Sequence, residues 1–179
     1  MKNTLLGVHV QYGRYHGDEA FVAAQHQVDA NIVSLAKTFK EAALGEIVGA
    51  ELVDRREYLW GDESYLLPEF KAHISRRTQG YISSPFEDRS VPYPEAGDTI
   101  FVMGYNGPFC VADTLASLTK KAAEVGFDVY MVEDCVGCFS SEVAKDWDDT
   151  LRQRLKDSGV NFVQSALVPS IAKRGFHVG

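Results

Sequence analysis

The segment from residue 99 to residue 135 constrains the fold of this 179-residue chain more than any other part of the sequence. It opens with a short apolar run at 100–103, which is typical of a strand buried on both faces. Glycine, asparagine and proline at 104–108 then end that strand abruptly. Apolar residues recur at helical spacing over 110–125. Gly126 then ends the helix pattern, and a second apolar run follows at 129–132. The pattern predicts a strand, a helix and a parallel strand.

The rest of the chain alternates strand and helix patterns in the same way. Strands are expected at 4–11, 46–53, 72–75 and 161–168, helices around 28–39 and 143–155, a loop with a short helix at 54–69, and a long connection at 83–98. Alternation of this kind favours a parallel sheet covered by helices on both faces. We therefore expect a single domain over residues 1–179, an α/β protein built as a three-layer α/β/α sandwich with a mostly parallel sheet of about six strands.

Composition and charge narrow the class of protein. The net charge of −7 argues against nucleic acid or an anionic membrane as a partner, because both attract basic patches. The sequence has no run of 18 apolar residues, and its first residues do not resemble a signal peptide. Its three cysteines are an odd number and indicate free thiols. We expect a cytoplasmic protein.

Cys110 opens the predicted helix, and this position has a chemical consequence. Backbone N–H groups and the helix dipole favour negative charge at a helix N-terminus, so they are expected to lower the pKa of the thiol. A thiol activated in this way is a nucleophile suited to acyl transfer. The alternative is a structural cysteine, since free cysteine is often buried as a small hydrophobic residue.

The residues around Cys110 read G-Y-N-G-P-F-C-V-A-D-T-L and resemble the signature of the isochorismatase-like cysteine hydrolases. In that family a glycine six residues before the cysteine ends a strand, and the turn that follows holds a cis peptide bond. The resemblance implies that Gly104 is this glycine and that the cis bond joins Tyr105 to Asn106. It continues through E-V-G-F-D-V-Y-M-V-E-D-C and covers roughly residues 99–168.

The family uses an aspartate at the end of its first strand as a general base, a lysine at the end of its third strand, and the cysteine as nucleophile. The segment L-L-G-V-H-V-Q-Y-G aligns His9 with the aspartate. The segment H-I-S-R-R-T-Q-G-Y aligns Arg76 with the lysine, and Arg77 is the alternative one residue later. The resemblance therefore implies a catalytic set of Cys110, His9 and Arg76 in which two members are changed.

These changes have different chemical consequences. Histidine can accept a thiol proton near neutral pH and return it to a leaving amine, so His9 and Cys110 could form a working pair. Arginine keeps the positive charge of lysine and could stabilise an oxyanion, but it cannot exchange its proton. For His9 the alternative is a histidine of the core or one that supports the site without contacting substrate; the strand alternation places it on the face opposite Leu6, Val8 and Val10.

The resemblance also implies where an oxyanion and a substrate would bind. Backbone donors are expected from the turn before the helix, formed by Tyr105, Asn106, Gly107, Phe109 and Cys110; Pro108 has no N–H. Candidates for the substrate pocket are Gln11, Tyr58, Trp60, Arg77 and Tyr81. The substrate itself does not follow from these residues, since specificity depends on how loops are placed.

Cys135 and Cys138 form a C-x-x-C motif directly after a predicted strand. Such a motif invites a thioredoxin-like or a zinc-binding interpretation, but it lacks the second ligand pair of a zinc site. The sequence also lacks the Asp-x-His and His set with which nicotinamidases of the family bind metal. We expect no metal and no cofactor.

Two main functions remain open. The first is a cysteine hydrolase that cleaves the C–N bond of a small amide, carbamoyl or ureido compound through a thioacyl intermediate on Cys110. The second is a protein of the same fold that no longer catalyses and binds a small molecule or a protein partner. A redox protein based on the C-x-x-C motif is a third. We expect a small-molecule ligand, a homo-oligomer, and no nucleic acid or membrane partner.

Overall fold

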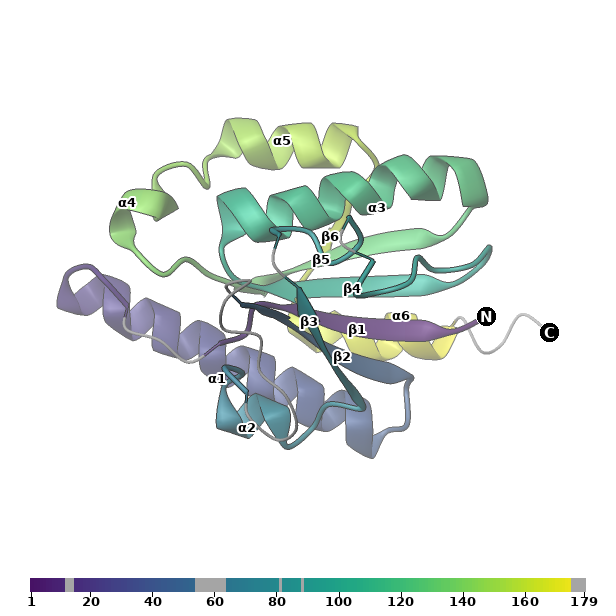
Figure 1. The fold of residues 1–179 in the computed structure, drawn as a ribbon, viewed down its shortest axis with the longest axis horizontal. Helices are drawn as coiled ribbons and strands as arrows, with labels where there is room; N and C mark the ends of the chain where they lie inside the picture. Colours follow the sequence, from purple (N-terminus) through teal and green to yellow (C-terminus); the bar gives the residue numbers. More distant parts are fainter. Residues whose placement is uncertain (12–14, 54–63, 81, 88, 175–179) are drawn as a thin grey trace.

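A computed structural model of the chain describes residues 1–11, 15–53, 64–80, 82–87 and 89–174. At its centre is a parallel six-stranded sheet with the strand order β3-β2-β1-β4-β5-β6 (Figure 1). The strands are β1 (Asn3–Val8), β2 (Glu46–Leu52), β3 (Arg76–Gly80), β4 (Thr99–Gly104), β5 (Asp128–Val136) and β6 (Asn161–Val163). This arrangement confirms the expected α/β class and the parallel sheet.

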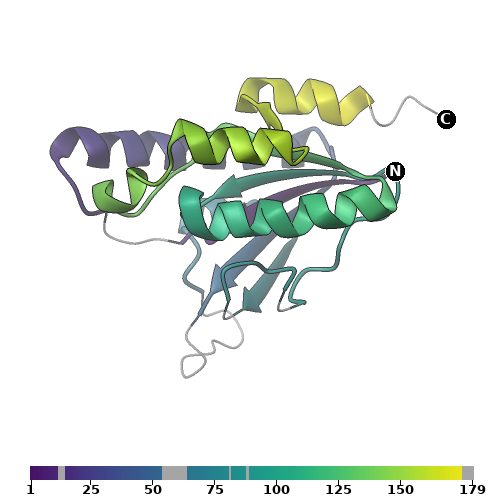
Figure 2. The ribbon, with the colours of Figure 1, turned by 90° about the horizontal axis from the view of Figure 1, so that it is seen from above.

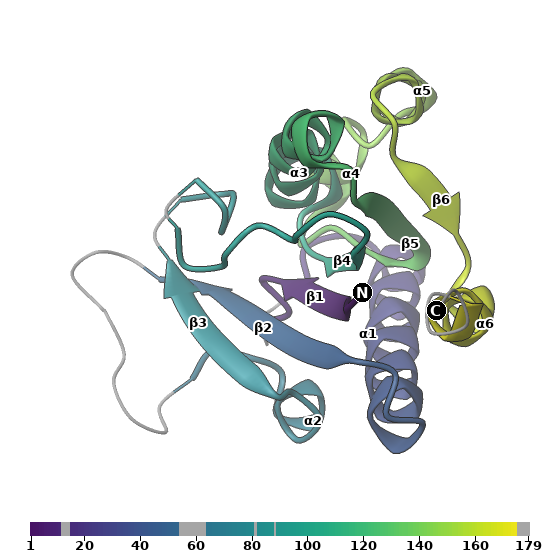
Figure 3. The same ribbon diagram turned by 90° about the vertical axis from the view of Figure 1, so that its right-hand side faces the viewer.

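Helices cover both faces of the sheet, as Figures 2 and 3 show from two further directions. One face carries α1 (Glu19–Glu41), α2 (Pro68–Lys71) and α6 (Val168–Arg174), and the other carries α3 (Ala112–Val125) and α5 (Asp149–Asp157). The short helix α4 (Ser141–Ala144) lies beside the π-helical turn Gly107–Val111, and a 3₁₀ turn, Ser165–Leu167, precedes α6. The three-layer sandwich is therefore confirmed.

Each face of the sheet has its own hydrophobic core. On the α1 face, Ile32, Leu35 and Phe39 of the helix pack on the sheet. On the α3 face, Leu115 and Leu118 do the same. The packed residues recur at helical spacing because an amphipathic helix buries one stripe against its neighbour. The two cores hold the strands in fixed register, so that their carboxyl ends meet at one edge of the molecule.

The third strand differs from the prediction of a strand at 72–75, which is wrong. Residues 68–71 form α2, residues 72–75 form the turn after it, and β3 begins only at Arg76. The strand consists of the polar sequence RRTQG and lies at the edge of the sheet, where most of its side chains are half-buried. A polar edge strand carries no apolar run, so hydrophobic patterning placed the strand too early.

Three further boundaries also differ from the expectation. The helix pattern at 143–155 is interrupted, because Asp148 caps a new helix, α5, whose Leu151 N–H donates to the Asp148 side chain. The last strand, expected at 161–168, stops after three residues at Val163. The first strand ends at Val8 and not at Gln11. None of the helices in the described part of the chain combines the length and apolar character that a membrane crossing requires.

Candidate active site

The order of the strands creates a topological switch point at one edge of the sheet. From β1 the chain crosses to β2 and β3 on one side, and from β4 it crosses to β5 and β6 on the other (Figure 1). The carboxyl ends of β1 and β4 are therefore the point where the direction of winding reverses, the usual ligand site of open α/β sheets. His9 directly follows β1, and Cys110 follows β4 after a short turn. Both sequence-predicted residues lie at this switch point.

The turn between β4 and Cys110 has the geometry that the resemblance implied. The peptide bond between Tyr105 and Asn106 is cis, which confirms the expectation. Gly104 has a φ of +121°, and a Cβ there would lie 2.0 Å from the carbonyl oxygen of Val8. Glycine is required at this position because a side chain would collide with the neighbouring strand. The Tyr105 N–H donates to the same Val8 carbonyl at 2.9 Å, so the turn is tied to the end of β1.

Cys110 lies within the π-helical turn that leads into α3, and its side chain is partly exposed. Burial raises the pKa of the thiol above its ordinary value. Backbone hydrogen bonding from Asn106 lowers it in part, and the nearby Asp113 carboxylate raises it again. The expectation of a lowered pKa is therefore wrong, since desolvation outweighs the favourable amides of the helix start. Cys110 is a protonated thiol at neutral pH and requires a base to become a nucleophile.

Three of the predicted oxyanion donors are already used in backbone hydrogen bonds, the Tyr105 N–H to Val8 and those of Gly107 and Phe109. The Gly107 N–H donates to the carbonyl of Gly137 at 2.9 Å, and the Phe109 N–H donates to the carbonyl of Asn106 at 3.2 Å. Gly107 also packs so closely on Trp147 that an added Cβ would lie 2.8 Å from the indole ring. Gly107 and Phe109 therefore shape the turn. The backbone amides whose hydrogen bonding lowers the pKa of the thiol are those of Asn106 and Cys110.

His9 is almost fully buried and has a φ of +48°, so the strand alternation ends at this residue. Its N–H donates to the carbonyl of Ala50 at 2.8 Å, and its own carbonyl accepts from the Gln11 N–H at 2.7 Å. The backbone of His9 is thus fixed between the ends of β1 and β2.

Arg76 does not reach this edge. It is the first residue of β3, and its Nε lies 2.9 Å from Glu46 Oε1 at the start of β2. The amino ends of the strands form the edge opposite to the one that carries Cys110. The prediction that Arg76 replaces the family's lysine beside the thiol is therefore corrected: the side chain forms an ion pair at the far edge of the sheet.

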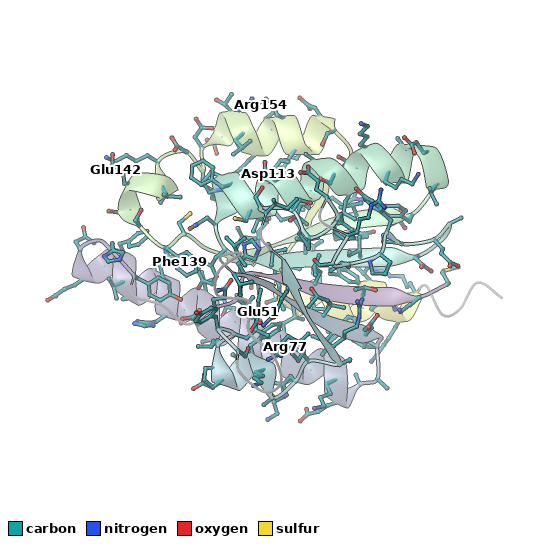
Figure 4. All side chains as sticks on the ribbon, in the orientation of Figure 1. Glu51, Arg77, Asp113, Phe139, Glu142 and Arg154 are labelled. Atoms are coloured by element: carbon teal, nitrogen blue, oxygen red, sulfur yellow. The ribbon has the colours of Figure 1, made fainter. Side chains whose placement is uncertain are left out.

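Arg77 points to the other face of β3 and meets a buried carboxylate that the sequence analysis missed (Figure 4). Glu51 is 1% exposed, and its Oε2 lies 4.0 Å from Arg77 Nε and 3.0 Å from Gln79 Nε2. Glu51 Oε1 accepts from the Leu66 N–H at 3.1 Å and from the Ser64 hydroxyl. A buried charge must be paired or hydrogen-bonded, and Glu51 is both. The position of this charged residue in the otherwise apolar sequence of β2 was the feature that could have identified it.

The remaining pocket candidates have different outcomes. Gln11 uses both ends of its side-chain amide on the backbone of Leu52, with distances of 3.1 and 2.8 Å, so it joins the segment after β1 to the end of β2. Tyr58, Trp60 and Tyr81 lie outside the described residues. Their place in a substrate pocket stays a prediction.

Asp113 is a second charged group that the sequence analysis did not single out. It lies three residues after Cys110 in the first turn of α3, close enough for its charge to act on the thiol. Its Oδ2 accepts from the Ser83 hydroxyl at 2.5 Å, which ties the segment after β3 to the start of α3. Its spacing of three residues from Cys110 places both side chains on one face of a helix, and this was the sequence feature that could have identified Asp113.

Cys135 and Cys138 are both buried as free thiols, and burial raises the pKa of each. A reactive C-x-x-C motif has the opposite property, a lowered thiol pKa, so the redox interpretation loses support. Within the described residues no three His, Cys, Asp or Glu side chains converge on a point where they could bind a metal ion.

Comparisons with known proteins place this geometry in context. No protein-family model matches the sequence, and no curated protein matches it either. Solved structures do match, among them a MAR1 ribonuclease from Caenorhabditis elegans at 16% identity and a TM-score of 0.59, covering 93% of this chain and 79% of that one. A nicotinamidase/pyrazinamidase from Bacillus subtilis matches at 16% identity and a TM-score of 0.61, over 92% of this chain and all (100%) of its own.

A third match is an isochorismatase-like hydrolase from Alkaliphilus metalliredigens, at 14% identity and a TM-score of 0.60, covering 94% of this chain and 95% of that one. These proteins differ in the activities that their names state, although they share one architecture. Identities this low establish architecture and not activity. This chain has the fold of the isochorismatase-like hydrolases.

Proposed function

We propose that the protein is a cysteine hydrolase that cleaves the C–N bond of a small amide, carbamoyl or ureido compound. The observation that carries this proposal is the setting of Cys110, a partly exposed thiol at the switch point of the sheet, with backbone amides of the cis turn beside its sulfur. A nucleophile with amide donors around it is the arrangement that acyl transfer requires. The shared fold of amide hydrolases supports it further.

In the first half of the reaction, the Cys110 sulfur attacks the carbonyl carbon of the substrate while the thiol proton passes to the imidazole of His9. A general base is needed here because the thiol is protonated at neutral pH. The carbonyl oxygen gains negative charge, and the N–H groups of Asn106 and Cys110 are the donors assigned to stabilise it. The C–N bond then breaks, and His9 returns the proton to the departing amine.

In the second half, a water molecule attacks the thioester carbon. His9 accepts a proton from this water, the C–S bond breaks, and Cys110 recovers its proton from His9 as the carboxylic or carbamic acid leaves. Atoms and charges balance over the cycle, and the net reaction is hydrolysis. Neither predicted arginine is assigned a role, because Arg76 lies at the opposite edge of the sheet and Arg77 pairs with the buried Glu51.

The experiment is an amide panel screened for amine release with the wild type and with Cys110→Ala and His9→Ala. Cys110→Ala should abolish turnover, and His9→Ala should lower kcat by about 10²- to 10⁴-fold, the usual contribution of a general base. Thr119→Val serves as a matched control, because it removes a buried hydroxyl from the same helix away from Cys110: the Thr119 hydroxyl donates to the Leu115 carbonyl at 3.0 Å. Turnover that persists in Cys110→Ala would refute the proposal.

A second function has one specific observation in its favour. The thiol pKa is raised, and the positive charge that the family places beside the cysteine is displaced to the far edge of the sheet. A protein that binds a small molecule without turnover would tolerate both changes. In that case the same panel should raise the melting temperature of the wild type without releasing amine, as expected for ligands that bind only the native state.

A further inference from the structure

A hydrogen-bonded cluster lies directly behind the turn that carries Cys110. Asp29 on α1 accepts a hydrogen bond from the Tyr15 hydroxyl at 2.6 Å through Oδ2. Its other oxygen, Oδ1, accepts from the Tyr105 hydroxyl at 2.7 Å. The two hydroxyl oxygens lie 3.0 Å apart. One carboxylate therefore holds two tyrosines that are distant in the sequence.

Tyr105 connects this cluster to the turn. It supplies the first half of the cis peptide bond, and its side chain is fully buried. Its ring stacks on Phe139 with centroids 4.9 Å apart and planes inclined by 16°. The Phe139 N–H in turn donates to Asn106 Oδ1 at 2.7 Å. Both residues of the cis bond are thus fixed by side-chain contacts behind the sheet edge.

Tyr15 connects the same carboxylate to the segment that follows His9. It lies six residues after His9, and its neighbour His16 donates its N–H to the Phe139 carbonyl at 2.8 Å. The chain that leaves β1 and the chain that leaves β4 are therefore anchored at one point. Any change in Asp29 acts on both segments at once.

The two hydroxyls are permanent donors to this carboxylate. Burial, and next the hydrogen bond to Asp29, raise the pKa of Tyr15. Burial raises the pKa of Tyr105 as well, followed by contributions from Tyr15 and Asp29. Both side chains stay protonated over the pH range of an assay. Hydrogen bonds to a charged acceptor are among the stronger ones in proteins, so the cluster is rigid.

We propose that Asp29 is a positioning residue that fixes the Cys110 thiol against the backbone amides of its turn, acting through Tyr105, and that anchors Tyr15 and His16 beside the same turn, acting through the Tyr15 hydroxyl. This assignment deepens the proposed function and rests on it for its catalytic meaning. Asp29 does not touch the thiol. Its effect is carried by the two hydroxyls and by the cis turn.

The test measures the reactivity of Cys110 directly and needs no substrate. Rates of iodoacetamide labelling are followed by mass spectrometry of the Cys110 peptide between pH 6 and pH 10, for the wild type, Asp29→Asn, Tyr105→Phe and Tyr15→Phe. If the turn loosens, the amides no longer stabilise the thiolate and the labelling profile moves to higher pH. We expect Asp29→Asn and Tyr105→Phe to lower labelling at pH 7 by about tenfold, the change that one pKa unit produces.

Glu133→Gln is the matched control. Glu133 is a partly buried carboxylate on β5 that pairs with Arg152 and accepts from Gln164 at 3.1 Å, so its loss should lower the melting temperature without touching the turn. Its labelling profile should match the wild type. Tyr105→Phe keeps the stacked ring and removes a single oxygen, so it guards against a variant that fails to fold.

A lower melting temperature with an unchanged labelling profile in both Asp29→Asn and Tyr105→Phe would overturn the assignment and leave Asp29 a structural residue. A shifted profile supports it, whether or not the wild type hydrolyses any amide in the panel. Failure of the hydrolase proposal is therefore seen in the amide screen, and failure of the positioning role is seen in the labelling profile.

Discussion

Replacing Gly104 with alanine tests the packing of the turn before Cys110. The backbone φ at Gly104 is +121°, which an L side chain rarely adopts. The new Cβ would lie 2.0 Å from the Val8 carbonyl oxygen and 2.9 Å from its carbon, and both atoms belong to the backbone of a central strand. The Val8 carbonyl also accepts the Tyr105 N–H at 2.9 Å. The substitution must therefore displace either the strand or the turn.

The expected cost has three parts. Positive φ costs an alanine about 1–2 kcal/mol, overpacking against the strand about 1–3 kcal/mol, and a weakened hydrogen bond about 1 kcal/mol. The sum is about 3–6 kcal/mol of unfolding free energy. At roughly 2–4 °C for each kcal/mol in a chain of this size, the melting temperature should fall by roughly 6–24 °C.

Urea denaturation and thermal melting of Gly104→Ala measure this loss, and Gly126→Ala is the matched control. Gly126 ends α3 with a φ of +87°, but no atom lies within 4 Å of an added Cβ. It should lose only about 1–2 kcal/mol, the cost of the backbone alone. A Gly104→Ala protein as stable as Gly126→Ala would show that the turn is not packed against β1 as described.

Three further predictions concern the ends of the sheet and the assembly. Arg76→Ala should cost about 0.5–1 kcal/mol, because its pair with Glu46 is partly exposed, and should leave amide hydrolysis unchanged. Burial raises the pKa of Glu46, but hydrogen bonds and charge from Lys2 and Arg76 outweigh it and lower that pKa. The ion pair therefore stabilises the fold at pH values above the ordinary glutamate pKa near 4.5, which applies to the unfolded chain. Titration should show that this stabilisation is lost as the pH falls through the lower pKa of Glu46 in the folded protein. Glu51→Ala should cost about 2–4 kcal/mol in urea denaturation, because it removes the buried carboxylate that accepts from the Leu66 N–H and the Gln79 amide and that pairs with Arg77. Sedimentation velocity should show a homo-oligomer, and a monomer at micromolar concentration would contradict that expectation.

The sequence was sufficient for the parts of the fold that hydrophobic patterning and turn chemistry control. The apolar run of β4, the glycine turn, the helix after it and the apolar run of β5 each carry a local signal, and the structure joins them in the parallel unit that these signals predicted. The position of Cys110 at the sheet edge and the cis bond after Tyr105 followed from this local segment and its resemblance. Both were therefore predicted correctly.

The charged residues could not be placed in the same way. The polar sequence RRTQG of β3 gives no apolar pattern that locates the strand, so the strand was expected at 72–75, ending just before Arg76. The structure begins β3 at Arg76, and this side chain therefore lies toward the amino edge of the sheet and not at the edge that carries Cys110. The pKa of Cys110 also escaped prediction, because it depends on how deeply the turn is buried and on the Asp113 charge. Helix position alone does not fix a pKa.

Intact-mass spectrometry of the enzyme, quenched in acid during turnover of a reactive anilide, detects the proposed thioacyl intermediate on Cys110. We expect an added mass equal to the acyl group, located on the Cys110 peptide, absent in Cys110→Ala and slower to form in His9→Ala. Steady release of aniline by the wild type with no acyl group on Cys110, or an adduct on Cys135 or Cys138, would contradict it.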